Sequence, residues 1–280
     1  MRTTAYRYPG EQVILLMTLG LVGGVIALTA AATVCASVLF ILAFIAMSFS
    51  FTRSQHQRLM RSARRVNPHN MPEVDEIAQQ GMARLQPGEV QVYVAASHEL
   101  NAYTFGLDTP KVVVLYSGLF QIMDRDELAF ILGHELGHVA LGHTWLNSLV
   151  GGIAGIPSSF SAGMLLTMAF LWWNRTCEYS ADRAGLLACG KPEKAVSALV
   201  KLGAGTQADT QMELAQAYRR IDAEDDTLLG SLNEALATHP MLIRRIQQIR
   251  AYAGSAEYAR LLRSMTQAGK FSHRQLPEGW

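Results

Sequence analysis

His134-Glu135-Leu136-Gly137-His138 is the segment from which the interpretation of this chain of 280 residues begins. On a helix, residues four apart lie on the same face, so His134 and His138 can present two imidazole rings to one metal ion. Glu135 lies beside them, within reach of a water molecule on that metal. The alternative is a pair of structural histidines held by hydrogen bonds. A bare HExxH also occurs by chance, so the surrounding sequence has to decide between the two.

The surrounding sequence predicts one helix over residues 124–143. It begins at Asp124, a residue type that caps helix N-termini. Gly133, Gly137 and Gly142 have no side chain and allow another backbone to approach this helix closely. These features favour the metal site over the structural pair.

A third ligand is needed, because a catalytic zinc takes three protein ligands and keeps one position open. Glu178 and Asp182 are four residues apart in a predicted helix over residues 175–189, so they share a face. We expect Glu178 to bind the metal and Asp182 to accept the free N–H of an imidazole ligand. A solvated acidic face is the commoner arrangement for such a pair, but it leaves the two histidines without a partner. His143, five residues after His138, is expected to lie off the zinc-facing side.

The other segments of the chain outside its long apolar stretches predict a mixed fold that is mostly helical. Residues 90–95 alternate as a strand does, and residues 111–116 form a second β-rich run. Apolar residues at helical spacing predict a helix over residues 71–85. Residues 193–262 are largely helical, with an interruption around His239-Pro240. The expected fold class is therefore α+β, with a small sheet beside the helix that carries the two histidines.

Two tracts without Asp, Glu, Lys or Arg explain why only 17% of the residues are charged while 50% are hydrophobic. The first, residues 12–52, is too long for a signal peptide and about twice the length of one membrane span. We expect a transmembrane helical hairpin, with residues 1–55 as the membrane anchor and residues 56–280 as a second domain. Arginines on both flanks predict that both ends are cytoplasmic. A single tilted helix followed by a buried apolar segment is the alternative.

The second uncharged tract, residues 144–174, lies between the histidine pair and Glu178. Because those residues must meet at one metal ion, the chain between them cannot cross a membrane an odd number of times. Two crossings need about 40 residues, more than this tract offers. We expect residues 145–173 to form an apolar hairpin insert that packs on the cleft or dips into one leaflet.

Further short elements narrow the assignment, because HExxH with ExxxD alone also fits thermolysin-like enzymes. These elements are Asn101-Ala102-Tyr103, Gly118-Leu119, Asp126-Glu127-Leu128 before the HExxH segment, and His239-Pro240. With them and the N-terminal apolar tract, the chain resembles the HtpX-type membrane zinc endopeptidases. That family is related to the CAAX prenyl protease and to a mitochondrial inner-membrane protease.

This resemblance implies a zincin-like metallopeptidase domain behind a transmembrane hairpin, with one Zn²⁺ per chain. His134, His138 and Glu178 match the family's zinc ligands. Glu135 matches its general base. His239 matches a histidine near the metal, where it would stabilise an oxyanion or cap the zinc; the alternative is a loop histidine before a helix-starting proline. Asn101, Ala102 and Tyr103 are expected to bind substrate. Either residues 101–105 or residues 111–116 are expected to pair with an extended peptide.

Zinc chemistry predicts the reaction of such a site. Zn²⁺ lowers the pKa of a bound water towards about 7, and Glu135 takes its proton and passes it to the leaving amine. By resemblance, the protein is expected to be a multi-pass endopeptidase of the cell inner membrane with its catalytic domain facing the cytoplasm. Its expected partners are the lipid bilayer and polypeptide substrates, misfolded membrane proteins above all.

Two other functions are less favoured. Processing of prenylated peptides fits less well, because those relatives have many more spanning helices. A catalytically inactive membrane scaffold or chaperone that retains a structural zinc is the alternative from another class. A formal net charge of +1 gives no electrostatic case for nucleic acid as a partner.

Overall fold

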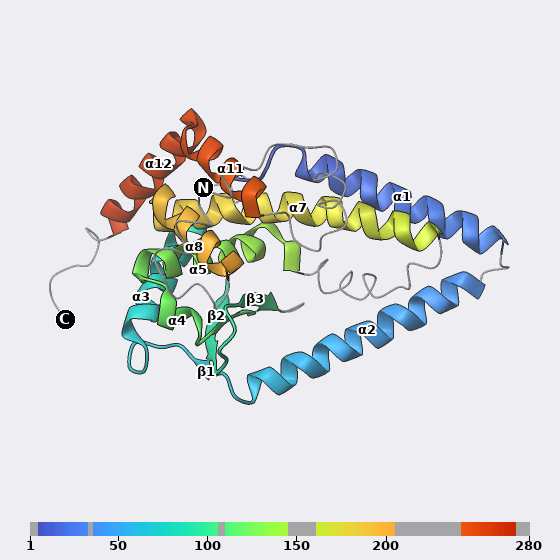
Figure 1. The fold of residues 1–280 in the computed structure, drawn as a ribbon, viewed down its shortest axis with the longest axis horizontal. Helices are drawn as coiled ribbons and strands as arrows, with labels where there is room; N and C mark the ends of the chain where they lie inside the picture. The colour runs from blue at the N-terminus through green and yellow to red at the C-terminus, as the bar shows by residue number, and fades with distance from the viewer. Residues whose placement is uncertain (1–4, 33–35, 106–109, 145–160, 205–241, 273–280) are drawn as a thin grey trace.

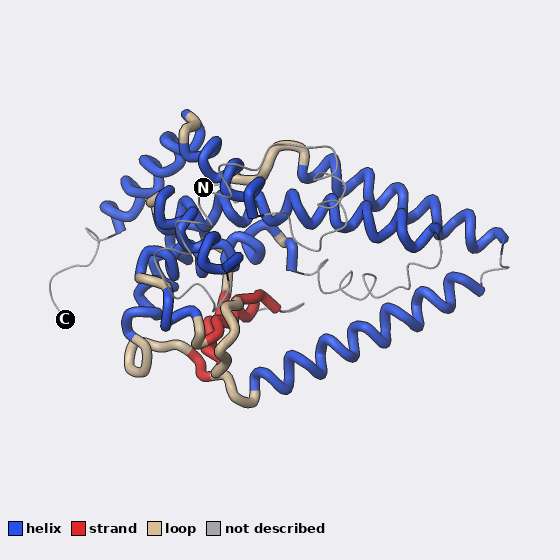
Figure 2. The backbone as a smooth tube through the Cα atoms, viewed as in Figure 1, coloured by secondary structure: helices blue, strands red, loops and turns tan. Residues whose placement is uncertain are grey.

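The computed structural model describes residues 5–32, 36–105, 110–144, 161–204 and 242–272, which form a mostly helical fold with one small mixed sheet (Figure 1 and Figure 2). The helices are α1 (Glu11–Ala32), α2 (Ala36–Met60), α3 (Pro72–Leu85), α4 (Leu119–Ile122), α5 (Arg125–Leu141), α7 (Ser161–Cys189), α8 (Pro192–Ala204), α11 (Leu242–Ala253) and α12 (Ala256–Ser272). The strands are β1 (Arg64–Arg65), β2 (Val90–Ala95), β3 (Ala102–Phe105) and β4 (Lys111–Tyr116). The expected mostly helical α+β class is confirmed.

The sheet has the strand order β1-β2-β4-β3. β2 and β4 are parallel, whereas β1 and β3 each pair antiparallel to their neighbour. The two strands predicted from the sequence, residues 90–95 and 111–116, form with these bounds. Because β4 is hydrogen-bonded to both β2 and β3, the expectation that residues 111–116 could pair with a substrate is wrong. Among the described strands, β3 lies at the edge of the sheet and pairs on one side only, with β4.

α5 begins and ends where its sequence dictates. The Asp124 side chain accepts hydrogen bonds from the first-turn backbone, and the Glu127 carboxylate accepts one from the Asp124 N–H, which completes a capping box. Gly142 follows the last turn with a φ of +77°, a left-handed conformation that glycine adopts without steric cost. The helix is buried along most of its length, so it forms the centre of the domain.

α5 and α7 pack so closely that glycine is required between them. A Cβ atom added at Gly133 would lie 2.3 Å from the Ala188 Cβ, and one at Gly137 would lie 2.5 Å from the Ala184 Cβ. On α7, a Cβ at Gly185 would meet the Phe130 carbonyl oxygen at 2.7 Å. These small residues therefore let the two helices approach each other at the level of the HExxH segment.

α7 is one continuous helix whose first half runs beside α1 (Figure 1). Phe170, Trp173 and Cys177 on α7 form a buried cluster with apolar side chains of α1. The Thr18 hydroxyl on α1 donates a hydrogen bond to the Ala169 carbonyl at 3.2 Å. Residues 161–173 of the expected insert thus belong to a helix that packs on the N-terminal helix, and residues 145–160 of the insert lie outside the described residues.

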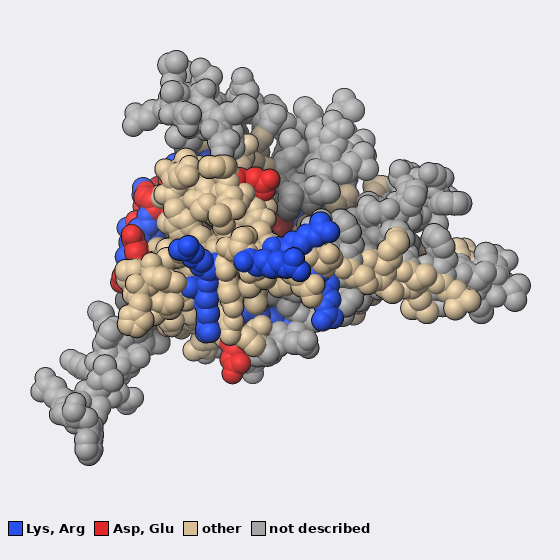
Figure 3. Space-filling model, turned by 90° about the horizontal axis from the view of Figure 1, so that it is seen from below, with Lys and Arg blue, Asp and Glu red and all other residues tan. Residues whose placement is uncertain are grey.

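Within the described part of the chain, one helical segment, Glu11–Thr29, is long and apolar enough to cross a membrane. Large apolar side chains cover its outer face, such as Leu16 and Leu28, which are 69% and 75% exposed. α2 diverges from α1 and leads back to the sheet (Figure 1). Near its end Lys and Arg side chains gather on one face (Figure 3), and the exposed arginines there are Arg53, Arg58, Arg61, Arg64 and Arg65.

Candidate metal centre

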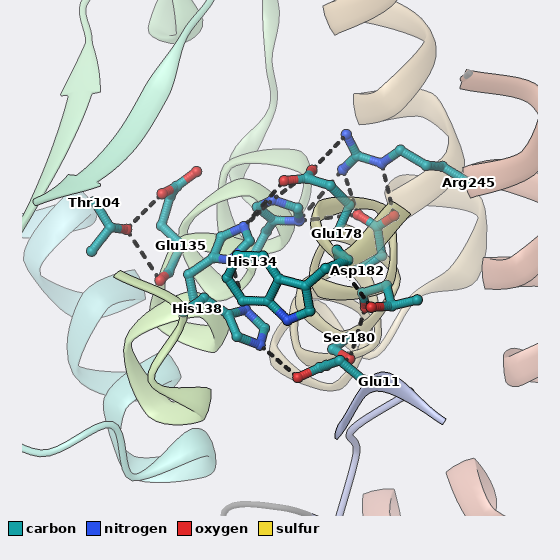
Figure 4. A network of polar contacts seen from close by, with 12 residues as sticks. Glu11, Thr104, His134, Glu135, His138, Glu178, Ser180, Asp182 and Arg245 are labelled. Atoms are coloured by element: carbon teal, nitrogen blue, oxygen red, sulfur yellow. Dashed lines mark hydrogen bonds and ion pairs between the residues drawn. The ribbon is translucent and has the colours of Figure 1, made fainter. Parts of the chain in front are cut away.

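Three donor side chains from α5 and α7 converge in the cleft beside the sheet (Figure 4). The Nε2 atoms of His134 and His138 lie 3.1 Å apart, and each lies 3.5 Å from a carboxylate oxygen of Glu178. All three residues are buried. Donors bound about 2.1 Å from a tetrahedral metal ion are separated by about 3.4 Å, so this triangle fits a metal such as zinc. The sequence predicted this set of residues, and the packing of α5 on α7 brings them together.

His134 is held from behind by a carboxylate and a guanidinium. Its Nδ1 atom lies 3.0 Å from Asp182 Oδ1, the contact expected for an imidazole that donates its second N–H. Arg245 on α11 donates to both oxygens of Asp182, at 2.8 and 2.6 Å, and its third nitrogen lies 3.2 Å from Glu178. One arginine therefore fixes the orientation of both carboxylates that α7 contributes.

The charge of Arg245 also contributes to the ionisation of these two carboxylates. Burial by itself would raise the pKa of Glu178 and of Asp182. The Arg245 guanidinium and the neighbouring histidines together outweigh burial, so the pKa of Glu178 lies well below its usual range and that of Asp182 is lowered. Both groups are therefore anionic at neutral pH, which is the form that binds a metal or accepts an imidazole N–H.

His138 is held by a chain of two hydrogen bonds that the sequence did not reveal. Its Nδ1 atom lies 2.9 Å from the Nδ1 atom of His143, and the His143 Nε2 atom lies 3.1 Å from the Glu11 carboxylate on α1. As expected, His143 is not part of the donor triangle. Burial lowers its pKa well below the usual value, so its ring is neutral.

Glu135 points toward β3 rather than toward the other carboxylates (Figure 4). The Thr104 hydroxyl donates to Glu135 Oε2 at 2.6 Å, and it also lies 3.2 Å from the Glu135 carbonyl. Together with the donor triangle, these residues line a cleft of about 540 Å³. Asn101, Ala102 and Tyr103, which were expected to bind substrate, line the same cleft.

Some site residues were missed from the sequence, and one expected residue cannot be placed. His239 lies outside the described residues. Arg245 follows it by six positions in an otherwise ordinary basic helix, and Thr104 has no distinguishing neighbours, so neither carried a sequence signal. Glu11 did carry one, because it is the last acidic residue before the long uncharged tract, where a charge is costly unless it has a partner.

Comparisons with known proteins agree with this arrangement. The model of the family described as Peptidase family M48 matches residues 68–253, more than half of the chain. The chain is 30% identical over 190 residues to the plastoglobule-localized metallopeptidase 48 of Arabidopsis thaliana, a match that covers 61% of this chain and 54% of the plant protein. It is 27% identical to a protease HtpX homolog of Pseudarthrobacter chlorophenolicus, over 68% of this chain and 75% of that protein. A protease HtpX of Xanthomonas axonopodis is 28% identical over 60% of this chain and 68% of its own length.

Proposed function

The chain belongs to peptidase family M48, and we propose that it is a zinc endopeptidase held in a membrane by its N-terminal helices. His134, His138 and Glu178 hold the ion in this proposal. The observation that carries it is the buried triangle of two imidazoles and one carboxylate, with Glu135 beside it in the same open cleft. Its donor set and spacing match those of catalytic zinc sites, which use two histidines and a glutamate in one well-known class.

A zinc ion at this position would supply Lewis-acid chemistry, because it acidifies water and polarises a peptide carbonyl. Glu135 is then the general base: it takes a proton from the attacking water and delivers it to the leaving amine. The Thr104 hydroxyl, 2.6 Å from Oε2, holds this carboxylate on the β3 side of the cleft. Arg245 and Asp182 keep Glu178 and His134 in place. His239 stays a candidate for oxyanion stabilisation.

The substrate is proposed to bind as an added strand along β3. This strand is the edge of the sheet next to the donor triangle, and residues 101–104 line the cleft. An extended peptide can hydrogen-bond to such an edge through its backbone, which gives affinity without demanding a particular sequence. Asn101, Ala102 and Tyr103 would make these contacts, and a broad substrate range such as that of a quality-control protease follows.

The membrane attachment is proposed from the exposed apolar surface of α1 and α2. A soluble domain does not expose a continuous apolar helix of this length, whereas a lipid-facing helix does. The exposed arginines at the end of α2 suit the anionic headgroups of a cytoplasmic leaflet (Figure 3). The proposed topology therefore has α1 and α2 as a transmembrane hairpin and the cleft on the cytoplasmic side, where misfolded membrane proteins are the expected substrates.

Zinc content and casein cleavage by the full chain in detergent test this function. We expect one zinc per chain, cleavage that a chelator abolishes, and recovery when zinc is restored. His138→Ala should lose both zinc and cleavage, because a ligand is removed. His69→Ala, at an exposed histidine far from the triangle in the sequence, is the matched control and should retain both. Zinc bound through His138 without any cleavage would instead support the inactive scaffold.

A further inference from the structure

We propose that the first turn of α1 is a part of the metal centre, in which Glu11, acting through His143, positions the ligand His138. This inference rests on the proposed function, since it assumes that His138 binds the metal. It gives the N-terminal helix a second task besides attachment to a membrane. Glu11 lies outside residues 68–253, the segment that the family model matches.

The contact path from Glu11 to the metal ligand is short and buried. Glu11 is 1% exposed and His143 is 2% exposed. The distance from the Glu11 carboxylate to His143 Nε2 is 3.1 Å, and the distance from His143 Nδ1 to His138 Nδ1 is 2.9 Å. No step of this path exceeds ordinary hydrogen-bond length, and the two rings meet edge to face with their centroids 5.1 Å apart.

The direction of each hydrogen bond follows from the chemistry of the groups. A carboxylate only accepts, so the His143 Nε2–H must donate to Glu11. Two Nδ1 atoms 2.9 Å apart form a hydrogen bond only when one carries a proton and the other a lone pair. With one proton on each ring, and that of His143 on Nε2, the Nδ1–H of His138 donates to His143 Nδ1. This leaves the lone pair of His138 on Nε2, the atom that faces Glu178 and His134. The path therefore selects the one tautomer of His138 that can bind a metal at the triangle.

Glu11 is itself fixed by α7 and by the segment that precedes α1. Arg7 forms an ion pair with its carboxylate and donates to the Leu141 carbonyl at 2.9 Å. The Ser180 hydroxyl donates to the other Glu11 oxygen and accepts the Tyr8 N–H at 2.7 Å. Ser180 lies on α7, two residues from Glu178. The same helix thus carries a metal ligand and the residue that holds the outer end of the path.

A second metal site is the competing interpretation of this cluster, because Glu11, His143 and Cys177 also lie close to one another. The charges argue against it. Arg7 already neutralises the Glu11 carboxylate, so another cation would be repelled. The His143 nitrogens are engaged with Glu11 and His138. The cluster is therefore a hydrogen-bonded support for a ligand.

Zinc affinity of the purified full chain, measured in detergent by competition with a chromophoric chelator, tests this positioning role. We expect His143→Phe, which has a ring but no acceptor, to weaken zinc binding about 10–100-fold. His143→Gln offers an amide oxygen to the His138 N–H and should recover a part of that loss. Glu11→Gln should weaken binding about tenfold, because it removes the charge that orients His143.

A cobalt-substituted sample gives a readout that does not depend on activity. The visible absorption bands of Co²⁺ report ligand geometry, and we expect them to shift in His143→Phe and to return toward wild type in His143→Gln. Thr18→Val is the matched control, because it removes a hydrogen bond between the same two helices, α1 and α7, without touching the path. It should keep the wild-type affinity and spectrum. Thermal unfolding identifies any variant that fails to fold. If Glu11→Gln fails to fold, the comparison of His143→Phe with His143→Gln tests the positioning role by itself.

The outcomes separate the two proposals. If wild type binds zinc through His138 and cleaves casein, while folded His143→Phe binds zinc with wild-type affinity, the positioning role is overturned and the proposed function stands. Equal losses in His143→Phe and His143→Gln would also overturn it, since the acceptor would then have no effect. If wild type binds no zinc, the proposed function fails and the positioning role fails with it.

Discussion

The two histidines of the HExxH segment are held in place in different ways. His134 reaches an anionic partner in one step, at Asp182 on the neighbouring helix α7. His138 reaches one in two steps, through His143 to Glu11 at the start of the N-terminal helix. The same need, an acceptor for the second imidazole N–H, is met by the neighbouring helix α7 for one histidine and by the N-terminal helix α1 for the other.

Each of the two supports ends in a buried carboxylate that pairs with a partly buried arginine. Asp182 is paired with Arg245, and Glu11 is paired with Arg7. Burying a carboxylate without a partner is costly, so each arginine is what allows its carboxylate to lie under a metal ligand. The two supports differ in length, and under the proposed function the longer one predicts that displacing α1 from α7 weakens metal binding.

Of the two supports, the short one is expected to have the larger effect on zinc affinity when it is broken. Asp182→Asn should weaken zinc binding about 10–100-fold, because the amide is a weaker acceptor for His134 and leaves Arg245 facing a neutral group. Chelator competition on the full chain measures it. Asp126→Asn is the control, since Asp126 lies on α5 at the surface and pairs with Lys191.

Comparison of Asp182→Asn with Glu11→Gln then sharpens the difference between the supports. A direct carboxylate should matter more than one that acts through a second ring, so Asp182→Asn is expected to lose at least as much affinity as Glu11→Gln. A larger loss in Glu11→Gln than in Asp182→Asn would contradict the order of the two supports.

A smaller effect, on kcat alone, is expected at Thr104, because its hydroxyl contacts the proposed general base Glu135 and none of the proposed metal ligands. Thr104→Val removes the hydroxyl that donates to Glu135, at a cost of about 1.5 kcal/mol or a tenfold fall in kcat, with zinc content unchanged. Thr104→Ser keeps the hydroxyl and should keep most of the activity. Steady-state peptide cleavage with a parallel zinc assay measures both; a loss of zinc in Thr104→Val would show that the contact acts on the ligands instead.

The sequence predicts the parts of this site that depend on a helical repeat. His134 with His138, and Glu178 with Asp182, were paired correctly because residues four apart share a face. Gly133 and Gly137 also indicated the close approach of another backbone, which the structure shows to be that of α7.

Contacts made by packing between distant segments could not be predicted. Arg245 and Thr104 reach the site from α11 and β3, and no local pattern places them there. Glu11, on α1, is marked by its position before the uncharged tract, which indicates that it needs a partner but not which residue that partner is. His143 illustrates the limit within a single segment. The prediction extended the helix through residue 143, but α5 ends at Leu141 and Gly142 turns the chain with a positive φ. His143 is therefore not where a regular helix would put it, and it contacts His138.

The most direct test of the account is a Glu135→Gln variant of the full chain assayed for zinc and for casein cleavage in the same sample. The account predicts one zinc per chain, as in wild type, and cleavage reduced by about 10²–10⁴-fold, because the base is lost while the three ligands remain. Full proteolysis by this variant would contradict the account, and so would the loss of its zinc.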